Sequence, residues 1–308
     1  MRLVRFGPEG HERPGLLDGD GVLRDCSSEV ADWSGEWLGR ASLARIAALD
    51  SRRFPPVREH PRLGIPVAGV RKILAVGLNY TDFAQAAVRP LPAEPVLFSK
   101  AVSSLTGPYD EIMLPRDSTH TDWEVELGVF IGRTARYVEE ADALAHVAGY
   151  ALINDISERE YQNDRGGAWD KGKGCDTFAP VGPWLVTADE LHEPQRIDLW
   201  LDVNGHRYQD SHTGRMVFGV AALVAYISRF ITLEPGDLIA TGTPAGVGSM
   251  QKPEPQYLRA GDIMRLGSSR LGVQEHRVVE WSLAKKLLDK PAEAIEIGKQ
   301  HPGLIQRD

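Results

Sequence analysis

The sequence lacks the features that mark several large protein classes. It has two cysteines in 308 residues, Cys26 and Cys175. They are too few for a disulfide framework or a zinc knuckle, and they fit a reduced compartment. No run approaches the roughly 18 apolar residues of a membrane span, and the N-terminus has no apolar signal-peptide core. We therefore expect a cytoplasmic protein with no membrane partner.

The charge pattern excludes a second group of partners. The net charge is −8, and no Lys/Arg run or interleaving of basic and aromatic residues occurs. Both observations argue against nucleic acid or an anionic membrane surface as a ligand. With 42% hydrophobic residues the chain can bury a substantial core. We expect a globular protein that acts on a small molecule.

Common catalytic motifs are also missing. The sequence contains no Gly-x-Ser-x-Gly, His-Glu-x-x-His or Gly-x-Gly-x-x-Gly, which argues against a serine hydrolase, a zinc protease or a dinucleotide-binding enzyme. Residues 167–174 come close to a phosphate-binding P-loop. However, Gly174 stands where that loop has Ser or Thr, and no apolar strand precedes it. A nucleotide triphosphatase is therefore not expected.

The most informative segment is 121–132, whose Val, Leu, Phe and Ile content predicts a β-strand. Side chains alternate along a strand, so Glu124 and Glu126 are expected to share one face. Burying two like charges costs on the order of several kcal/mol unless a positive charge lies between them. A hard divalent cation with oxygen ligands would meet this need. The pattern also fits an edge strand with two solvated glutamates.

The order of the segments predicts an α+β chain that is mostly β. Four prolines between residues 51 and 68 indicate an extended linker. We expect a small β-rich N-terminal domain and linker at 1–67, a catalytic domain at 68–281, and a C-terminal helix and tail at 282–308. Asn204-Gly205 predicts a tight β-hairpin.

Further polar residues follow predicted strands, where side chains are often presented for function. The strand at 149–153 ends in Asn154-Asp155, so Asp155 is a candidate third carboxylate, although a turn or helix cap would use the same residue. The strand at 95–100 ends in Lys100. The Gly-rich segment 241–248 could bring backbone N–H groups against an anion.

Seven ordered motifs resemble the fumarylacetoacetate hydrolase family. The resemblance spans about residues 70–280, and the first 65 residues resemble the small N-terminal domain that many members carry. The motifs are Gly77-Leu-Asn-Tyr80, Glu94-Pro-Val-Leu-Phe-x-Lys100, Asp122-Trp-Glu-Val-Glu-Leu-Gly-Val129, Asn154-Asp-Ile-Ser-Glu-Arg159, Gly172-Lys-x-Cys-Asp-Thr-Phe178, Pro180-Val-Gly-Pro-Trp-Leu-Val186 and Pro235-Gly-Asp-x-Ile-x-Thr-Gly-Thr-Pro-x-Gly-Val-Gly248.

This resemblance implies a mixed β-roll or β-sandwich catalytic domain, usually in a homodimer. It implies Mg²⁺, or Mn²⁺ or Ca²⁺, bound by Glu124, Glu126 and Asp155. The substrate would be a 2-oxo acid or β-dicarbonyl, and the cation would stabilise an enolate as a C–C bond breaks or a proton leaves.

The resemblance also implies roles for residues around the cation. Lys173 and Lys100 would offset the negative charge of the bound anion. Each of these positions could instead hold a surface charge or a turn residue. The implied substrate-binding residues are Tyr80, Arg159, Gln162, Gly242 and Thr243.

The sequence departs from the hydrolytic members in one respect. Many carry a His and, three residues later, a Glu that activate water as a general base. Here those positions are Phe83 and Ala86. The segment Tyr80-Thr-Asp-Phe matches fumarylacetoacetate hydrolase itself, in which the Asp binds the metal, so Asp82 is a candidate catalytic residue and fourth ligand. His120 could approach the pocket as a replacement base.

Three functions follow from this pattern. The first is metal-dependent C–C hydrolysis of a 2,4-dioxo acid such as an acylpyruvate. The second keeps the enolate without water, as in tautomerisation, decarboxylation, dehydration or ring closure. The third is an inactive binding subunit.

Overall fold

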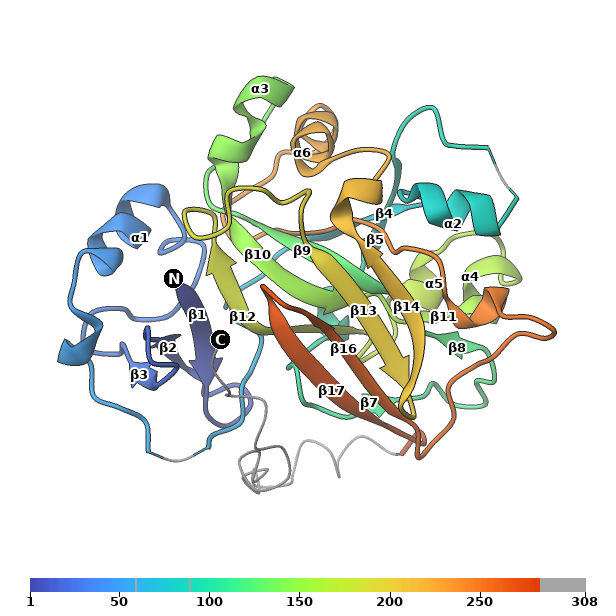
Figure 1. Cartoon of the computed structure of the whole chain (residues 1–308), viewed down its shortest axis with the longest axis horizontal. Helices are drawn as coiled ribbons and strands as arrows, with labels where there is room; N and C mark the ends of the chain where they lie inside the picture. The colour runs from blue at the N-terminus through green and yellow to red at the C-terminus, as the bar shows by residue number, and fades with distance from the viewer. Residues whose placement is uncertain (59, 89, 283–308) are drawn as a thin grey trace.

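Two β-sheets pack face to face and form most of the molecule (Figure 1). The computed structural model describes residues 1–58, 60–88 and 90–282. The strands of the larger, ten-stranded sheet are, in spatial order, β3 (Leu23–Asp25), β2 (Arg13–Leu17), β1 (Arg2–Phe6), β12 (Ala179–Thr187), β10 (Val147–Asn154), β9 (Val125–Ile131), β15 (Leu238–Ala240), β4 (Ile73–Gly77) and β5 (Val96–Lys100), with β6 (Leu105–Thr106) paired to β12.

The second sheet lies across β9 and β10 of the first (Figure 1). The predicted hairpin at Asn204-Gly205 is confirmed, because it joins β13 (Asp198–Val203) to β14 (His206–His212) with Val203 opposite His206. A further pair, β8 (Thr121–Asp122) and β11 (Ser157–Glu158), stands apart. The strands of the second sheet are, in order, β14 (His206–His212), β13 (Asp198–Val203), β16 (Ile263–Ser268), β17 (Gly272–Val279) and β7 (Ile112–Met113).

Helices are short and lie at the edges of the sheets (Figure 1). None in the described part of the chain has the length and apolar composition that a membrane span requires. They are α1 (Arg40–Ala47), α2 (Thr81–Ala86), α3 (Glu140–Ala143), α4 (Arg159–Asn163), α5 (Asp170–Lys173) and α6 (Val220–Ser228), with 3₁₀ turns η1 (Ser51–Arg53), η2 (Val102–Ser104), η3 (Leu144–His146), η4 (Thr213–Arg215) and η5 (Gly248–Met250).

Alternation along β9 divides its side chains between two cores. Val125, Leu127 and Val129 face the second sheet and pack in the core between the sheets. Phe130 faces the opposite side and packs with residues of the N-terminal segment. Glu126 alternates with Val125 and Leu127, so the strand phase directs it away from the inter-sheet core. The mostly β fold class that the sequence predicted is confirmed.

One predicted element is wrong. The segment 121–132 is not one strand, because β8 ends at Asp122 and β9 begins at Val125. Glu124 lies in the break between them. Strand alternation alone therefore does not bring the two glutamates together.

The proposed division of the chain stays a prediction. The segments before and after residue 67 share one hydrogen-bonded sheet, since β1, from the first segment, pairs with β12, from the second. The side chains of Arg62 and Asp110 also connect the two regions, with 2.8 Å between Arg62 Nε and Asp110 Oδ1. The predicted C-terminal helix lies outside the described residues.

The Arg62 connection provides a stability test. Its guanidinium also donates to Glu12 at 2.8 Å, and its side chain is only 16% exposed. Removing one partner of a buried ion pair leaves uncompensated charge, so we expect Arg62→Ala to cost about 3 kcal/mol, the low end of the range for such pairs. Denaturant unfolding measures this cost. Arg53→Ala, at an exposed arginine, is the control. An equal loss of stability in both variants would contradict the stabilising role of the buried Arg62 ion pairs.

Candidate active site

The end of β10 and the start of β9 place three acidic residues in one buried cluster. The two strands are antiparallel, with Asn154 opposite Val125 and Ile153 opposite Glu126. The residue after β10, Asp155, donates its backbone N–H to the carbonyl of Glu124 at 2.9 Å. Carboxylate oxygens of Glu124, Glu126 and Asp155 lie within 4.8 Å of one another. We call these three residues the carboxylate cluster.

Burial makes the carboxylate cluster electrostatically costly. Glu124 is 6% exposed, Glu126 1% and Asp155 0%. Burial, followed by the charges of Asp155 and Glu124, raises the pKa of Glu126 well above its usual value. In the described part of the chain, Glu126 has no ion pair with a Lys or Arg. Its Oε2 accepts one hydrogen bond, from the Gly242 N–H at 2.8 Å.

Lys173 lies against the other two members of the cluster. Its ammonium is 2.7 Å from both Glu124 Oε2 and Asp155 Oδ2, and the residue is 2% exposed. Burial alone would lower the pKa of Lys173, but the charges of Asp155 and Glu124 outweigh it and the pKa is raised. Lys173 therefore remains charged inside the site.

Lys100 supports Asp155 from the opposite side. Its ammonium is 2.7 Å from Asp155 Oδ1 and donates to the carbonyls of Ile156 and Lys173. Burial, helped by the nearby charge of Lys173, lowers the pKa of Lys100. The pKa of Asp155 is lowered, because both ammonium groups outweigh its burial. Lys100 thus joins Asp155 to the segment that carries Lys173.

Arg159 forms the third cationic contact. Its guanidinium is 2.7 Å from Glu124 Oε1 and 2.8 Å from Asp122 Oδ2, and it donates to Gln162 Oε1 at 3.1 Å. Burial opposes the charge, but Asp122 and Glu124 raise the pKa of Arg159. The predicted residues Arg159 and Gln162 therefore lie together beside the cluster.

Tyr80 also lies near the cluster. It is fully buried, and its hydroxyl has no hydrogen-bond partner among the described residues. Burial, then the charges of Glu126 and Asp82, raises its pKa well above the usual value. A buried hydroxyl without a partner is costly, so a bound ligand that reached it would gain a hydrogen bond.

Three other predicted residues have different surroundings. Asp82 accepts from Ser211 Oγ at 2.6 Å and is 3.3 Å from Arg215, and it is not in the carboxylate cluster. The Thr243 hydroxyl donates to the Val125 carbonyl at 3.0 Å. The Gly242 N–H is used by Glu126, as described above. A fourth-ligand role for Asp82 and substrate binding by this loop stay predictions.

The structure reveals supporting residues that the sequence did not single out. Asp122 is fully buried and accepts from the backbone N–H groups of Gly248 and Ser249 at 2.6 and 3.0 Å. The Asn154 amide oxygen accepts from the Glu124 N–H at 2.9 Å. Both lie within the quoted motifs, but nothing in those motifs distinguishes a supporting role from a ligand role.

His120 lies outside the carboxylate cluster. Its ring nitrogen is 2.8 Å from Thr119 Oγ1, and its ring packs edge-on against Tyr257. A ring nitrogen of His120 and carboxylate oxygens of Glu158 and Glu160 form a separate cluster, within 4.8 Å of one another. The geometry does not favour His120 as a replacement base at Glu124, Glu126 and Asp155.

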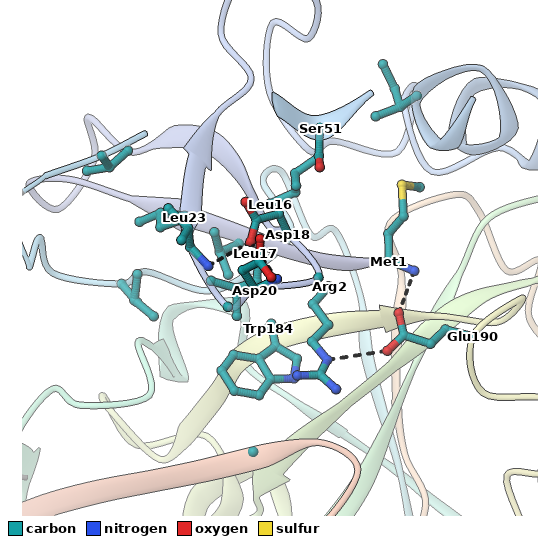
Figure 2. A pocket seen from close by; sticks show the side chains of 18 of the residues that line it. Met1, Arg2, Leu16, Leu17, Asp18, Asp20, Leu23, Ser51, Trp184 and Glu190 are labelled. Atoms are coloured by element: carbon teal, nitrogen blue, oxygen red, sulfur yellow. Dashed lines mark hydrogen bonds and ion pairs between the residues drawn. The ribbon is translucent and has the colours of Figure 1, made fainter. Parts of the chain in front are cut away.

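A cavity of about 1220 Å³ opens elsewhere, between the N-terminal strands and the start of β17. Arg2 and Trp184 lie close together in its wall, and Arg2 is joined to Glu190 (Figure 2). None of the predicted site residues lines it. The carboxylate cluster is therefore the better candidate for the catalytic centre.

Comparison with known proteins agrees with the motifs and the geometry. Residues 72–279 match the family described as fumarylacetoacetate (FAA) hydrolase, C-terminal. The chain belongs to the fumarylacetoacetate hydrolase family. Family members are hydrolases and isomerases, so the chain is an enzyme, and the alternative of an inactive binding subunit is not supported.

Individual relatives cover nearly the whole chain. A protein of Burkholderia lata with the provisional name hydrolase is 56% identical over 274 residues, which are 89% of this chain and 97% of the relative. Maleylpyruvate hydrolase from Sphingobium sp. SYK-6, solved with manganese(II) and pyruvate, is 30% identical with a TM-score of 0.74, covering 92% of this chain and 100% of that one. The 5-carboxymethyl-2-hydroxymuconate delta-isomerase from Mycobacterium smegmatis is 32% identical with a TM-score of 0.73 over the same shares.

Glu126 is the most direct test of the site. We expect Glu126→Gln to weaken Mn²⁺ binding by more than about 100-fold, because a direct ligand contributes more than the outer partners whose loss costs 10- to 100-fold. Calorimetry on the metal-free protein measures the affinity. Glu111→Gln, an exposed glutamate outside the cluster, is the control. Unchanged affinity in Glu126→Gln would count against the site.

Proposed function

We propose that this enzyme is a divalent-metal-dependent hydrolase that cleaves a C–C bond of a 2,4-dioxo acid such as an acylpyruvate. The observation that carries the proposal is the buried carboxylate cluster with Lys173 and Arg159 against it. Maleylpyruvate hydrolase, a related enzyme, was solved with manganese and pyruvate, and pyruvate is the 2-oxo acid part of an acylpyruvate.

The donor set fits a hard divalent cation. Three carboxylates offer oxygen ligands, and Mg²⁺ and Mn²⁺ prefer such ligands. Glu126 is buried without a cationic partner in the described chain, so one carboxylate of the cluster has no counter-charge beside it. Glu124, Glu126 and Asp155 would hold the cation. When bound, it would supply positive charge that stabilises an enolate.

The cationic side chains of the chain would bind and orient the substrate. Lys173 keeps its charge in a water-poor site, so it can offset the carboxylate of a 2-oxo acid. Arg159 is held on two sides by Asp122 and Glu124. Its guanidinium is therefore held in one orientation, in which it can bind an anion. The Tyr80 hydroxyl can donate a hydrogen bond to the same ligand. Lys100 fixes Asp155 and, in this proposal, does not touch the substrate.

A specific observation favours a second candidate, an isomerase or another enolate enzyme that uses no water. Phe83 is half-buried against the inter-sheet core and Ala86 is exposed on α2. Neither can accept a proton, so α2 carries no pair that would activate water. The M. smegmatis relative is an isomerase.

Acylpyruvate assays separate the two candidates. We expect acetylpyruvate absorbance to fall in the presence of Mn²⁺ or Mg²⁺, and the rate to drop to background after chelation, because the carboxylates alone do not stabilise the enolate. Deuterium exchange next to the ketone, without cleavage, would support the isomerase. Neither reaction in protein that binds Mn²⁺ would contradict the substrate class.

The missing water-activating pair can be restored. We expect Phe83→His combined with Ala86→Glu to raise acetylpyruvate hydrolysis by about 10-fold or more, since a positioned general base contributes about 10²- to 10⁴-fold. Steady-state kinetics at saturating Mn²⁺ measures the gain. Gln85→Glu, which adds a carboxylate at another exposed position of α2, is the control. No gain would show that this pair is not what limits hydrolysis.

A further inference from the structure

Gln209 is a buried side chain that the proposed chemistry does not use. It lies on β14, in the second sheet, and is fully buried. Its amide oxygen accepts from the Val125 N–H at 2.9 Å, and its amide nitrogen donates to Thr243 Oγ1 at 2.8 Å and to the Pro244 carbonyl at 3.0 Å. Both protons of the amide nitrogen therefore have acceptors.

These contacts close a ring around the backbone of Val125. The Thr243 hydroxyl, which accepts from Gln209, donates to the Val125 carbonyl at 3.0 Å. The N–H and the C=O of Val125 are thus both bound by a side chain. On this edge of β9, strand β15 pairs only as far as Ala240 opposite Gly128. Gln209 and Thr243 continue the hydrogen bonding where β15 has ended.

The ring surrounds the backbone that joins two members of the carboxylate cluster. Val125 is between Glu124 and Glu126 in the chain, so the position of its peptide groups sets the spacing of the two carboxylates. Thr243 follows Gly242, whose N–H donates to Glu126 at 2.8 Å. One side chain from the second sheet therefore contacts both the backbone that carries the glutamates and the loop whose N–H binds one of them.

Close packing fixes β14 against this loop. Gly246 lies so near the carbonyl of Tyr208 that any side chain at this position would collide with it, and its φ of +108° favours glycine. The next residue with the same strand phase, Ser211, donates to Asp82 on α2 at 2.6 Å. The inner face of β14 therefore reaches both the site strand and α2.

We propose that Gln209 is a positioning residue that sets the divalent-cation affinity of the carboxylate cluster. The inference rests on the proposed function, in which this cluster holds the cation. The hydrogen bonds of Gln209 go to Val125, Thr243 and Pro244 and not to a carboxylate of the cluster, and the proposed function gives it no contact with the substrate. Its effect is on the geometry of the ligands, and such outer partners typically change metal affinity by about 10- to 100-fold.

The test is Mn²⁺ titration of metal-free Gln209→Met by calorimetry, well below its melting temperature. Methionine has a similar size but cannot bind the Val125 N–H or donate to Thr243. We expect the Kd for Mn²⁺ to rise about 10- to 100-fold. Raising the Mn²⁺ concentration should restore part of any acylpyruvate turnover.

Gln274→Met is the matched control. Gln274 is also fully buried, and it too makes three hydrogen bonds, to the carbonyls of Leu152 and Gly182 and to His276. We expect it to lower the melting temperature as much as Gln209→Met does, with the Kd for Mn²⁺ unchanged. If Gln209→Met does not fold, Thr243→Val opens the same ring and is expected to weaken Mn²⁺ binding similarly.

The outcomes separate this inference from the proposed function. Equal Mn²⁺ affinity in wild type and the ring variants would overturn the role of Gln209 and leave the metal site intact. An equal loss of affinity in Gln274→Met would also overturn it. Wild-type protein that binds no Mn²⁺ would overturn both proposals. Mn²⁺ binding without acylpyruvate turnover would contradict the substrate class alone, and Gln209 would still be judged by the affinities.

Discussion

Repulsion among three buried carboxylates is the constraint on which the site depends. Glu124, Glu126 and Asp155 meet in a region with almost no access to water, where their charges are poorly screened. Lys173 compensates Glu124 and Asp155, and Lys100 compensates Asp155 a second time. Among the described residues, Glu126 receives a single hydrogen bond, from a backbone N–H. The chain thus places its positive charge on Glu124 and Asp155, and a bound cation would compensate Glu126.

The fold brings these groups together through the ends of strands rather than along one strand. The end of β10 meets the start of β9, and the segments after β4 and β15 carry Tyr80 and Gly242. Where regular pairing stops, backbone groups need other partners. Side-chain amides meet this need: Asn154 binds the Glu124 N–H and Gln209 binds the Val125 N–H. The supports of the site are therefore direct consequences of how the sheet ends.

Much of the fold and of the candidate site could be predicted from the sequence. The hairpin turn, the mostly β composition and the convergence of three carboxylates follow from local patterns and family motifs. The prediction of one continuous strand through Glu124 was wrong, because a period-two sequence pattern also persists across a two-residue break between strands. Local sequence cannot show that break, since Glu124 is fixed by contacts with Asn154 and Asp155.

Long-range contacts explain what the sequence did not reveal. Gln209 lies 84 residues from Val125, and a glutamine in an alternating strand has no feature that distinguishes a supporting residue from a surface residue. Asp82 matches a ligand position of the resembled family, and the structure adds its contacts with the Ser211 hydroxyl and the Arg215 guanidinium, while its role as a ligand stays a prediction. Motifs identify residue types, whereas partners from distant strands decide what each residue contacts.

A crystal structure of the protein soaked with Mn²⁺ and oxalate, with anomalous scattering recorded for manganese, would show whether the carboxylate cluster holds the cation. We expect one ion coordinated by oxygens of Glu124, Glu126 and Asp155, with oxalate on the side that Arg159 and Lys173 face. Carboxylates that remain closed around Lys173, with no manganese between them at millimolar concentration, would contradict this expectation.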